Sequence, residues 1–306
     1  MPAVSVVIVT HNSREEIEEC LSSLPSDVEA IIVDNASQDG TPEVAAACRP
    51  DALLIRNTAN RGFGVANNQG LAAATGTYAL LLNPDAKAKP GSIEKLAAAL
   101  DERPDAVAAG GLLRFPDGRL QDSVAGRLTL WALFCEQTGL ERVLHCYWQT
   151  RRWLARGPGP HEVEQVMGAC LMLRRQPGGD FPAFEERFFL YCEDTELCRR
   201  LRSCGAILFV PEAEFVHQLG TSSEETRWRA VAYYNRGKEL YFRIHHGAAA
   251  WVLALAMNRL GALLRLLGWI AVLLIKPRSA ARKIPLFLRV LFAPIDPYSA
   301  WTGHKT

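Results

Sequence analysis

The sequence holds too little cysteine for a fold built on disulfide bonds. Its eight cysteines are spread over 306 residues, whereas disulfide scaffolds are short chains that are dense in cysteine. The closest cluster cannot share a zinc ion, because six-residue steps on a helix turn successive side chains about 120° apart; it comprises Cys192, Cys198 and Cys204. We therefore expect reduced, mostly buried thiols. The first residues also lack the basic start and apolar run of a secretory signal, which predicts a cytoplasmic chain.

Charge and hydropathy exclude further classes of protein. Charged residues make up 22% of the chain and its mean hydropathy is zero, which argues against a disordered chain and against a protein with many membrane spans. The sequence shows no internal repeat and no low-complexity tract. Its length suits one large domain, or one domain with an appendage.

Acidic residues are scarce at the end of the sequence. Residues 227–306 hold 13 lysines and arginines against two acids, a net charge of +11. Residues 1–226 hold 21 basic against 31 acidic residues, a net charge of −10. We therefore predict an acidic body over residues 1–226 and a basic, apolar tail over residues 227–306.

Short apolar runs alternate with helix-like stretches through the first half of the chain. The strand-like runs are Val4–Val9, Ala30–Val33, Ala52–Ile55, Tyr78–Leu82 and Ala106–Leu113. The helix-like stretches are Ile17–Leu24, Thr41–Cys48, Val65–Ala74 and Gly91–Leu100. This alternation predicts an α/β fold whose strands are covered by helices on both faces.

The second half is less regular. A turn at Pro116-Asp117-Gly118 ends the alternation, and residues 119–162 are expected to form a variable insertion. Further elements are expected at Val163–Leu173 (strand), Asp194–Ser203 (helix), and Ile207–Val210 and Glu214–His217 (short strands).

Polar residues follow four successive strands, where open α/β sheets bind their ligands. They are Thr10-His11-Asn12, Asp34-Asn35, Asn57 with Asn60-Arg61-Gly62, and Asn83-Pro84-Asp85. Each set alone is compatible with an ordinary turn, but four sets at one edge indicate a binding site. The segment from Gly62 does not match a dinucleotide-binding motif, because Asn67 takes the place of the last glycine, and no Walker motif is present.

Carboxylates at two places, and one histidine, suit particular chemistry. Asp85 follows an apolar strand, where a hard oxygen could bind a divalent ion on a diphosphate, although Asn-Pro-Asp is also a common turn. Glu193 and Asp194 come just before a helix, so Asp194 could cap that helix and also accept a proton from a hydroxyl nucleophile. His217 ends a later strand and alone is compatible with a structural histidine.

In this order the residues resemble the family 2 inverting glycosyltransferases of the GT-A fold, and among them the rhamnosyltransferase-like bacterial branch that builds cell-surface polysaccharide. The resemblance covers residues 3 to about 245 and depends on six motifs: Val4–Asn12, Ile31–Gly40, Asn60–Gly70, Asn83-Pro84-Asp85, Glu193-Asp194 and His217. It implies a mixed α/β sheet with helices on both faces and a nucleotide-sugar donor.

The resemblance also implies residue roles. The nucleotide-sugar site would comprise Thr10, Asn12, Asp34, Asn35, Asn60, Arg61, Gly62, Asn67 and Asn83. Asp85 and His217 would hold Mg²⁺ or Mn²⁺, with Asn83 at the first position of the family's Asp-x-Asp motif. Asp194 matches the general base and Glu193 its supporting neighbour. The implied reaction inverts the anomeric centre in a single displacement.

The donor is expected to be dTDP-L-rhamnose and the acceptor a lipid-linked glycan or polysaccharide of the cell envelope. Galactofuranose, a hexose or a hexosamine remains an alternative sugar. A sugar-phosphate nucleotidyltransferase would need a Gly-rich phosphate loop near residue 10, where Thr10-His11-Asn12-Ser13 stands instead. A non-catalytic glycan-binding relative is disfavoured, because the carboxylates and His217 are all present.

The tail contains an apolar stretch over Gly247–Ile275 that is interrupted by Asn258, Arg259 and Arg265. These polar residues favour a helix that lies on an anionic membrane surface over one that spans it, with a buried helical hairpin as a further alternative. We expect the enzyme to be peripheral on the cytoplasmic face of the inner membrane. A nucleic-acid role is disfavoured because no motif for it is present.

Overall fold

The computed structural model describes residues 3–218 and 227–294. They divide into two compact units, each described here by itself. The sheet unit comprises residues 3–127, 148–187 and 193–218, and the helical unit comprises residues 128–147, 188–192 and 227–294. Both units draw on segments that are distant in the sequence.

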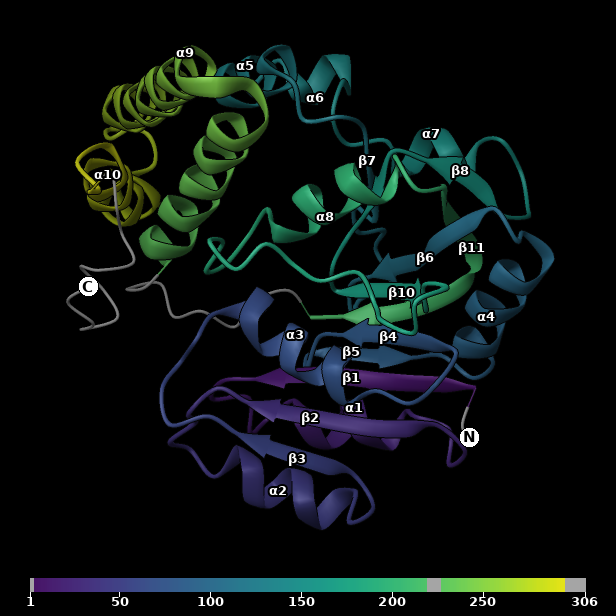
Figure 1. The fold of residues 1–306 in the computed structure, drawn as a ribbon. Helices are drawn as coiled ribbons and strands as arrows, with labels where there is room; N and C mark the ends of the chain where they lie inside the picture. Colours follow the sequence, from purple (N-terminus) through teal and green to yellow (C-terminus); the bar gives the residue numbers. More distant parts are fainter. Residues whose placement is uncertain (1–2, 219–226, 295–306) are drawn as a thin grey trace. The chain divides into compact units, whose positions relative to one another are not determined.

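The sheet unit is built on one mixed sheet (Figure 1). Its strand order is β3 (Leu53–Arg56), β2 (Glu29–Asp34), β1 (Val4–Thr10), β4 (Tyr78–Leu82), β10 (Cys170–Arg174), β6 (Ala106–Arg114), β11 (Ala206–His217) and β5 (Ala86–Ala88). Strands β1 to β4 run parallel, β10 is antiparallel to both of its neighbours, and β11 is parallel to β6. β8 (His161–Val163) adds to β11, and β7 (Val124–Ala125) pairs with β9 (Gln165–Val166).

Apolar side chains on both faces of the sheet explain why helices cover both. In β1, Val6 and Ile8 belong to one core and Val7 and Val9 to the other, as alternation along a strand requires. The first core includes residues of α1 (Ile17–Ser22), α2 (Thr41–Cys48) and α4 (Ser92–Glu102). The second includes residues of α3 (Phe63–Ala73) and α8 (Glu193–Leu201). The expected α/β class is confirmed.

Two expected strands differ from the structure. The stretch Val163–Leu173 is divided among β8, β9 and β10, because residues 167–169 leave the ladder where Gly168 donates its backbone N–H to Asp194. The two short strands expected at 207–210 and 214–217 are one strand, β11, with an irregularity between Val210 and Glu214. The expected insertion over 119–162 contains β7, α5 (Leu130–Thr138), α6 (Glu141–Leu144) and α7 (Thr150–Leu154).

The helical unit contains α5, α6, α9 (Arg227–Ala271) and α10 (Pro277–Leu291). α9 is broken at Gly247, whose φ of 81° and ψ of −177° lie outside the helical region, and Figure 1 shows two helical segments that meet at an angle. By length and composition α9 could cross a membrane. It is not the single uninterrupted helix from Gly247 to Ile275 that the sequence suggested, since α9 ends at Ala271 and a turn precedes α10.

The polar residues of α9 face other helices of the unit, whereas the helix expected to lie on a membrane surface would turn them outward. Asn258 is buried, donating to Glu239 Oε1 (2.8 Å) and accepting from Gln137 Nε2 (3.0 Å). Arg265 donates to Gln137 Oε1 (2.8 Å), and Arg259 donates to the backbone oxygen of Val290 (2.8 Å). Burial without partners would be costly for these groups, so their bonds fix how α9 packs on α5 and α10.

Candidate functional site

Thr10 and Asp34 form the first part of the site, at the ends of β1 and β2. The parallel pairing of these strands sets the two residues side by side. Thr10 Oγ1 donates to Asp34 Oδ1 (2.9 Å), and the backbone N–H of Ser37 donates to Asp34 Oδ2 (3.0 Å). Both side chains are buried. Asp34 is therefore a hydrogen-bond acceptor in a fixed orientation, as binding of a ribose or base would require.

Asn35 braces the loop that follows β3. Its Nδ2 donates to the carbonyl of Gly62 (3.0 Å), and its Oδ1 accepts from the backbone N–H of Arg61 (3.3 Å). Asn60 Oδ1 accepts from the N–H of Gly62 (2.9 Å), whose φ of 86° suits glycine. The exposed side chain of Arg61 is thus carried by a loop whose backbone is fixed.

Two other residues of the expected nucleotide site have mainly local contacts. Asn12 has a positive φ of 54°, and its Oδ1 accepts from the backbone N–H of Gln38 (2.8 Å), which ties the loops after β1 and β2 together. Asn67 lies in α3, is buried, and donates to the carbonyl of Phe63 (2.9 Å). Its amide therefore serves the first turns of α3, next to the Gly62 loop.

His217 is the centre of a second cluster, at the end of β11. Its Nε2 lies 3.1 Å from Asp85 Oδ1 and 3.2 Å from Asn83 Nδ2, and its Nδ1 lies 3.0 Å from Gln121 Oε1. An amide oxygen only accepts, so this contact places a proton on Nδ1. The lone pair of the neutral imidazole is then on Nε2, on the side of Asp85.

This cluster fits a divalent cation. A buried polar atom, Asn83 Oδ1, has no hydrogen-bond partner among the described residues. With Asp85 and His217 Nε2 it supplies oxygen and imidazole donors of the kind that Mg²⁺ and Mn²⁺ accept. The described ranges contain no group of three or more His, Cys, Asp and Glu side chains that could hold a metal, so this site would be completed by Asn83 and by non-protein ligands.

The sequence alone did not single out Gln121. It follows the turn at residues 116–118, which returns the chain so that the backbone N–H of Gln121 donates to the carbonyl of Leu113 in β6 (3.0 Å). Nothing in the sequence pattern predicts that a single glutamine after a hairpin turn contacts His217. The contact with His217 Nδ1 depends on the pairing of β6 with β11.

Glu193 and Asp194 begin α8 and form the third part of the site. Asp194 Oδ2 accepts from the backbone N–H of Gly168 (2.9 Å), and its Oδ1 accepts from the N–H of Thr195 (2.7 Å). A Cβ on Gly168 would lie 3.0 Å from Asp194 Cβ, so the close approach needs glycine. The chain enters α8 through two non-glycine residues with positive φ, Tyr191 (71°) and Cys192 (68°), which is strain of the kind that is common at functional sites.

The surroundings of the acidic pair favour the protonated form of its carboxyl groups. Desolvation by burial, and then the adjacent Asp194 charge, raise the pKa of Glu193 to about 8. Burial also raises the pKa of Asp194, against its hydrogen bonds with Gly168 and Thr195. Glu193 Oε2 is buried and has no partner among the described residues. A carboxylate with a raised pKa is a stronger base than a solvated one.

All three parts lie at one edge of the sheet. β1, β2, β4, β6 and β11 run in the same direction, so their carboxyl ends share an edge, and the antiparallel β10 starts there, with Cys170 opposite Leu82. The N–H of Asn83 donates to the carbonyl of Ala169 (3.1 Å), next to the glycine that holds Asp194. The structure thus brings the expected nucleotide, metal and base residues to one edge.

Comparison with known proteins identifies the family. Residues 5–156 match the model of glycosyl transferase family 2. The chain is 30% identical, over 263 residues, to the N-acetylglucosaminyl-diphospho-decaprenol L-rhamnosyltransferase of Mycobacterium tuberculosis, covering 79% of this chain and 84% of the relative.

Solved structures show the same fold at low identity. A Pyrobaculum calidifontis mannosyltransferase in complex with GDP-Man and Mn²⁺ superimposes with a TM-score of 0.52 at 20% identity, covering 95% of this chain and 87% of that chain. Staphylococcus aureus TarS gives a TM-score of 0.51 at 17% identity, covering 98% and 92%. The expected GT-A fold is confirmed, and the chain belongs to glycosyltransferase family 2.

Proposed function

We propose that this enzyme transfers L-rhamnose from dTDP-L-rhamnose to a lipid-linked glycan in cell-envelope synthesis, with inversion at the anomeric carbon. The mycobacterial relative is named for rhamnosyl transfer to a decaprenol-linked N-acetylglucosaminyl diphosphate, which supports both the sugar and the class of acceptor. The observation that carries the chemistry is Asp194, a carboxylate of raised pKa held by Gly168 at the edge where the nucleotide residues lie.

Asp194 acts as the base in this proposal. It accepts the proton of an acceptor hydroxyl while that oxygen forms a bond to the anomeric carbon, and the bond from that carbon to the nucleoside diphosphate breaks on the opposite face. Gly168 N–H holds one carboxylate oxygen and Thr195 N–H the other. Glu193 is buried beside it, and burial together with the Asp194 charge raises the pKa of Glu193 to about 8.

The donor would be held by the other two parts of the site. Asp34 and Asn35 would orient the nucleoside, and Arg61 would contact the diphosphate. A bound Mg²⁺ or Mn²⁺ ion supplies neutralisation of the charge that develops on the leaving diphosphate. Asp85, His217 and Asn83 Oδ1 would hold that ion, and Gln121 would keep His217 in the metal-binding tautomer.

We further propose that the enzyme works as a peripheral protein on the cytoplasmic face of the plasma membrane. Apolar side chains of α9 that are largely exposed support this, with Leu253 at 49%, Leu260 at 45%, Leu267 at 53% and Ile270 at 49%. The polar residues of the same helix bond to α5 and α10 instead. This arrangement, with polar groups inward and leucines outward, suits contact with lipid.

A screen of nucleotide sugars tests the donor. The purified protein is incubated with Mn²⁺ and with dTDP-rhamnose, UDP-galactofuranose, UDP-hexoses or UDP-N-acetylhexosamines, and thermal stability is measured. We expect the largest stabilisation with dTDP-rhamnose, and rhamnosyl transfer to a polyprenyl-diphosphate N-acetylglucosamine with inverted configuration by NMR. A larger rise in thermal stability and faster transfer with another nucleotide sugar would identify that sugar as the donor instead. A retained configuration would exclude the single displacement.

A further inference from the structure

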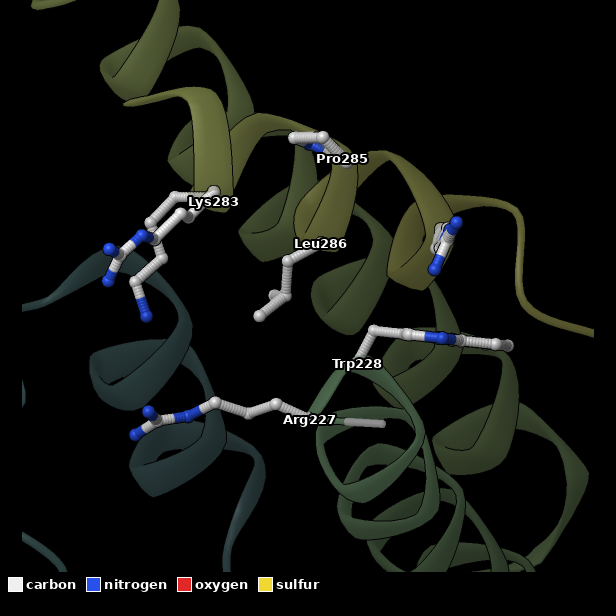
Figure 2. Close-up of a pocket in the computed structure, with 7 residues that line it drawn as sticks. Arg227, Trp228, Lys283, Pro285 and Leu286 are labelled. Atoms are coloured by element: carbon white, nitrogen blue, oxygen red, sulfur yellow. The ribbon is translucent and has the colours of Figure 1, made fainter. Parts of the chain in front are cut away.

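Within the helical unit, a pocket of about 200 Å³ lies between the first turn of α9 and α10 (Figure 2). It is lined by Arg227, Trp228, Arg282, Lys283, Pro285, Leu286 and Arg289. Four of these seven residues are cationic. Its floor is apolar, because Leu286 packs with Ala262 and Val290 in a small buried core.

The charges come from two elements. On α10, the steps from Arg282 to Leu286 and from Leu286 to Arg289 are four and three residues, which puts them on one face. Figure 2 shows the charged ends of Lys283 and Arg227 on the same side of Leu286, with Trp228 on the other side. The pocket therefore has converging cations over an apolar floor.

The acids of the helical unit are engaged elsewhere. Glu136 pairs with Lys238, and Glu239 pairs with Arg236. Glu141 accepts from the backbone N–H of Tyr147 (2.9 Å). Among the described residues of this unit, these are its acids, and Glu136 and Glu239 are paired with Lys238 and Arg236 rather than with the cations of the pocket. Like charges around a pocket repel one another, so an anion is the ligand that these cations favour.

The neighbourhood of the pocket indicates what carries that anion. Leu274 (95% exposed) and Ile275 (77%) come just before α10, and Phe292 (76%) comes just after it. Such residues insert at the level of the acyl chains, whereas cations between them lie at the depth of lipid phosphates. Arginine guanidinium groups bind phosphate with paired hydrogen bonds, and tryptophan is enriched at this depth.

We propose that the α9–α10 pocket binds the anionic phosphate group of a membrane lipid. This rests on the proposed function only in that a lipid-linked acceptor requires the enzyme to work at a bilayer. Its binding is separate from the donor chemistry, which belongs to the sheet unit. It can therefore be tested without donor, metal or acceptor.

The test compares two double variants that remove the same charge from the same helix. Lys283→Gln with Arg289→Gln alters the pocket, and Lys276→Gln with Arg278→Gln alters exposed positions outside it. Binding is measured to phosphatidylcholine vesicles with phosphatidylglycerol, and to vesicles given the same surface charge by a carboxylate lipid, cholesterol hemisuccinate. Arg227→Gln, from α9, is the independent variant if the α10 double variant lowers the melting temperature.

On phosphatidylglycerol vesicles we expect the pocket variant to lose about 30-fold in affinity, since each cation near an anionic surface contributes about fivefold. The control variant should lose several-fold less affinity than the pocket variant. On carboxylate vesicles this difference between the two variants should disappear. Equal losses for the two variants would indicate diffuse surface charge and overturn the proposal. An equally large difference between the two variants on carboxylate vesicles would also overturn the proposal.

Inorganic phosphate and pyrophosphate separate the lipid from a soluble source. If the wild-type protein ignores vesicles but gains thermal stability from pyrophosphate, and the pocket variant does not, the ligand is a soluble phosphate and the lipid source is wrong. Failure of the nucleotide-sugar screen would leave the vesicle result unchanged. The two proposals therefore fail separately.

Discussion

Asp194, the proposed general base, can be tested by a single substitution. Asp194→Asn keeps the shape of the side chain and one oxygen that can accept from Gly168 N–H, but it replaces the other oxygen, which accepts from Thr195 N–H, with an amide NH₂ that is not a base. We expect the transfer rate to fall by about 10²–10⁴-fold, the range typical of a general base. Donor affinity, measured by calorimetry with Mn²⁺, should stay within about twofold, because Asp194 is not among the proposed donor contacts.

The matched control is Asp117→Asn, which alters an exposed turn carboxylate paired with Arg119. It should leave both transfer and donor binding unchanged. Wild-type turnover by Asp194→Asn would remove the base assignment. A parallel loss of donor affinity and rate would instead make Asp194 a binding residue.

The raised pKa of Glu193 makes the free energy of unfolding depend on pH. Because its pKa is raised from 4.5 to about 8, the folded protein holds a proton over this range that the unfolded chain has released. The stabilising contribution of Glu193 to the free energy of unfolding is therefore present at low pH. It is lost as the pH rises from 4.5 to about 8, with a slope of up to about 1.4 kcal/mol per pH unit. Glu193→Gln should flatten the fall in unfolding free energy between about pH 5 and pH 8.

Urea denaturation at several pH values measures this slope. Glu94→Gln, which alters an exposed carboxylate of α4, should reproduce the wild-type slope. An identical slope for Glu193→Gln would show that Glu193 does not carry the proton. The pKa of the adjacent Asp194 is also raised by burial, so the Glu193→Gln, Asp194→Asn double variant separates the two carboxyls.

Gln121 is a positioning residue for the proposed metal site. Gln121→Leu removes the acceptor on His217 Nδ1, and loss of such an outer partner typically lowers metal affinity by about 10–100-fold. We expect that loss in Mn²⁺ titrations of the dTDP complex. Gln121→Glu, which keeps an oxygen acceptor, should restore affinity. Gln176→Leu, at an exposed position, should have no effect, and equal affinities for all three variants would contradict this role.

At the scale of elements, the sequence predicted best where burial is uniform. The strand Tyr78–Leu82 has the expected bounds because all five residues are buried, and α2 has its expected bounds, Thr41–Cys48, with Pro42 in its first turn. Prediction failed where a long-range contact overrides local preference. Residues 167–169 leave the sheet to serve Asp194, and no local pattern encodes that hydrogen bond.

The break in α9 can be tested with two glycines that differ only in backbone conformation. A Cβ on Gly247 or on Gly268 would meet no atom within 4 Å, but Gly247 has a φ of 81°. Gly247→Ala should therefore destabilise the helical unit by about 1 kcal/mol. Gly268→Ala, within the helix, should stabilise it by up to about 1 kcal/mol. Thermal melts followed by circular dichroism report the sign, and two shifts of the same sign would exclude the break.

At the scale of the whole molecule, the net charge of +1 conceals an acidic part and a basic part. The boundary predicted near residue 227 stays a prediction about domains, while α9 begins at that residue. The sequence showed that Asn258, Arg259 and Arg265 interrupt an apolar stretch. It could not show that they bond inward, because their partners Gln137 and Val290 belong to other helices.

That inward bonding leaves an apolar surface whose membrane role can be measured. Leu274→Ser with Ile275→Ser alters two side chains that are 95% and 77% exposed, so the fold should keep its melting temperature. If both side chains insert into lipid, each contributes up to about 1.5–3 kcal/mol, and vesicle affinity should fall by at least about tenfold. Val143→Ser, at a 76% exposed position on α6, removes a similar side chain elsewhere in the same unit. Sedimentation with phosphatidylglycerol vesicles should separate the two. An equal loss for both variants would mean that exposed apolar area alone drives binding, and unchanged binding by the double variant would exclude insertion at this end of α9.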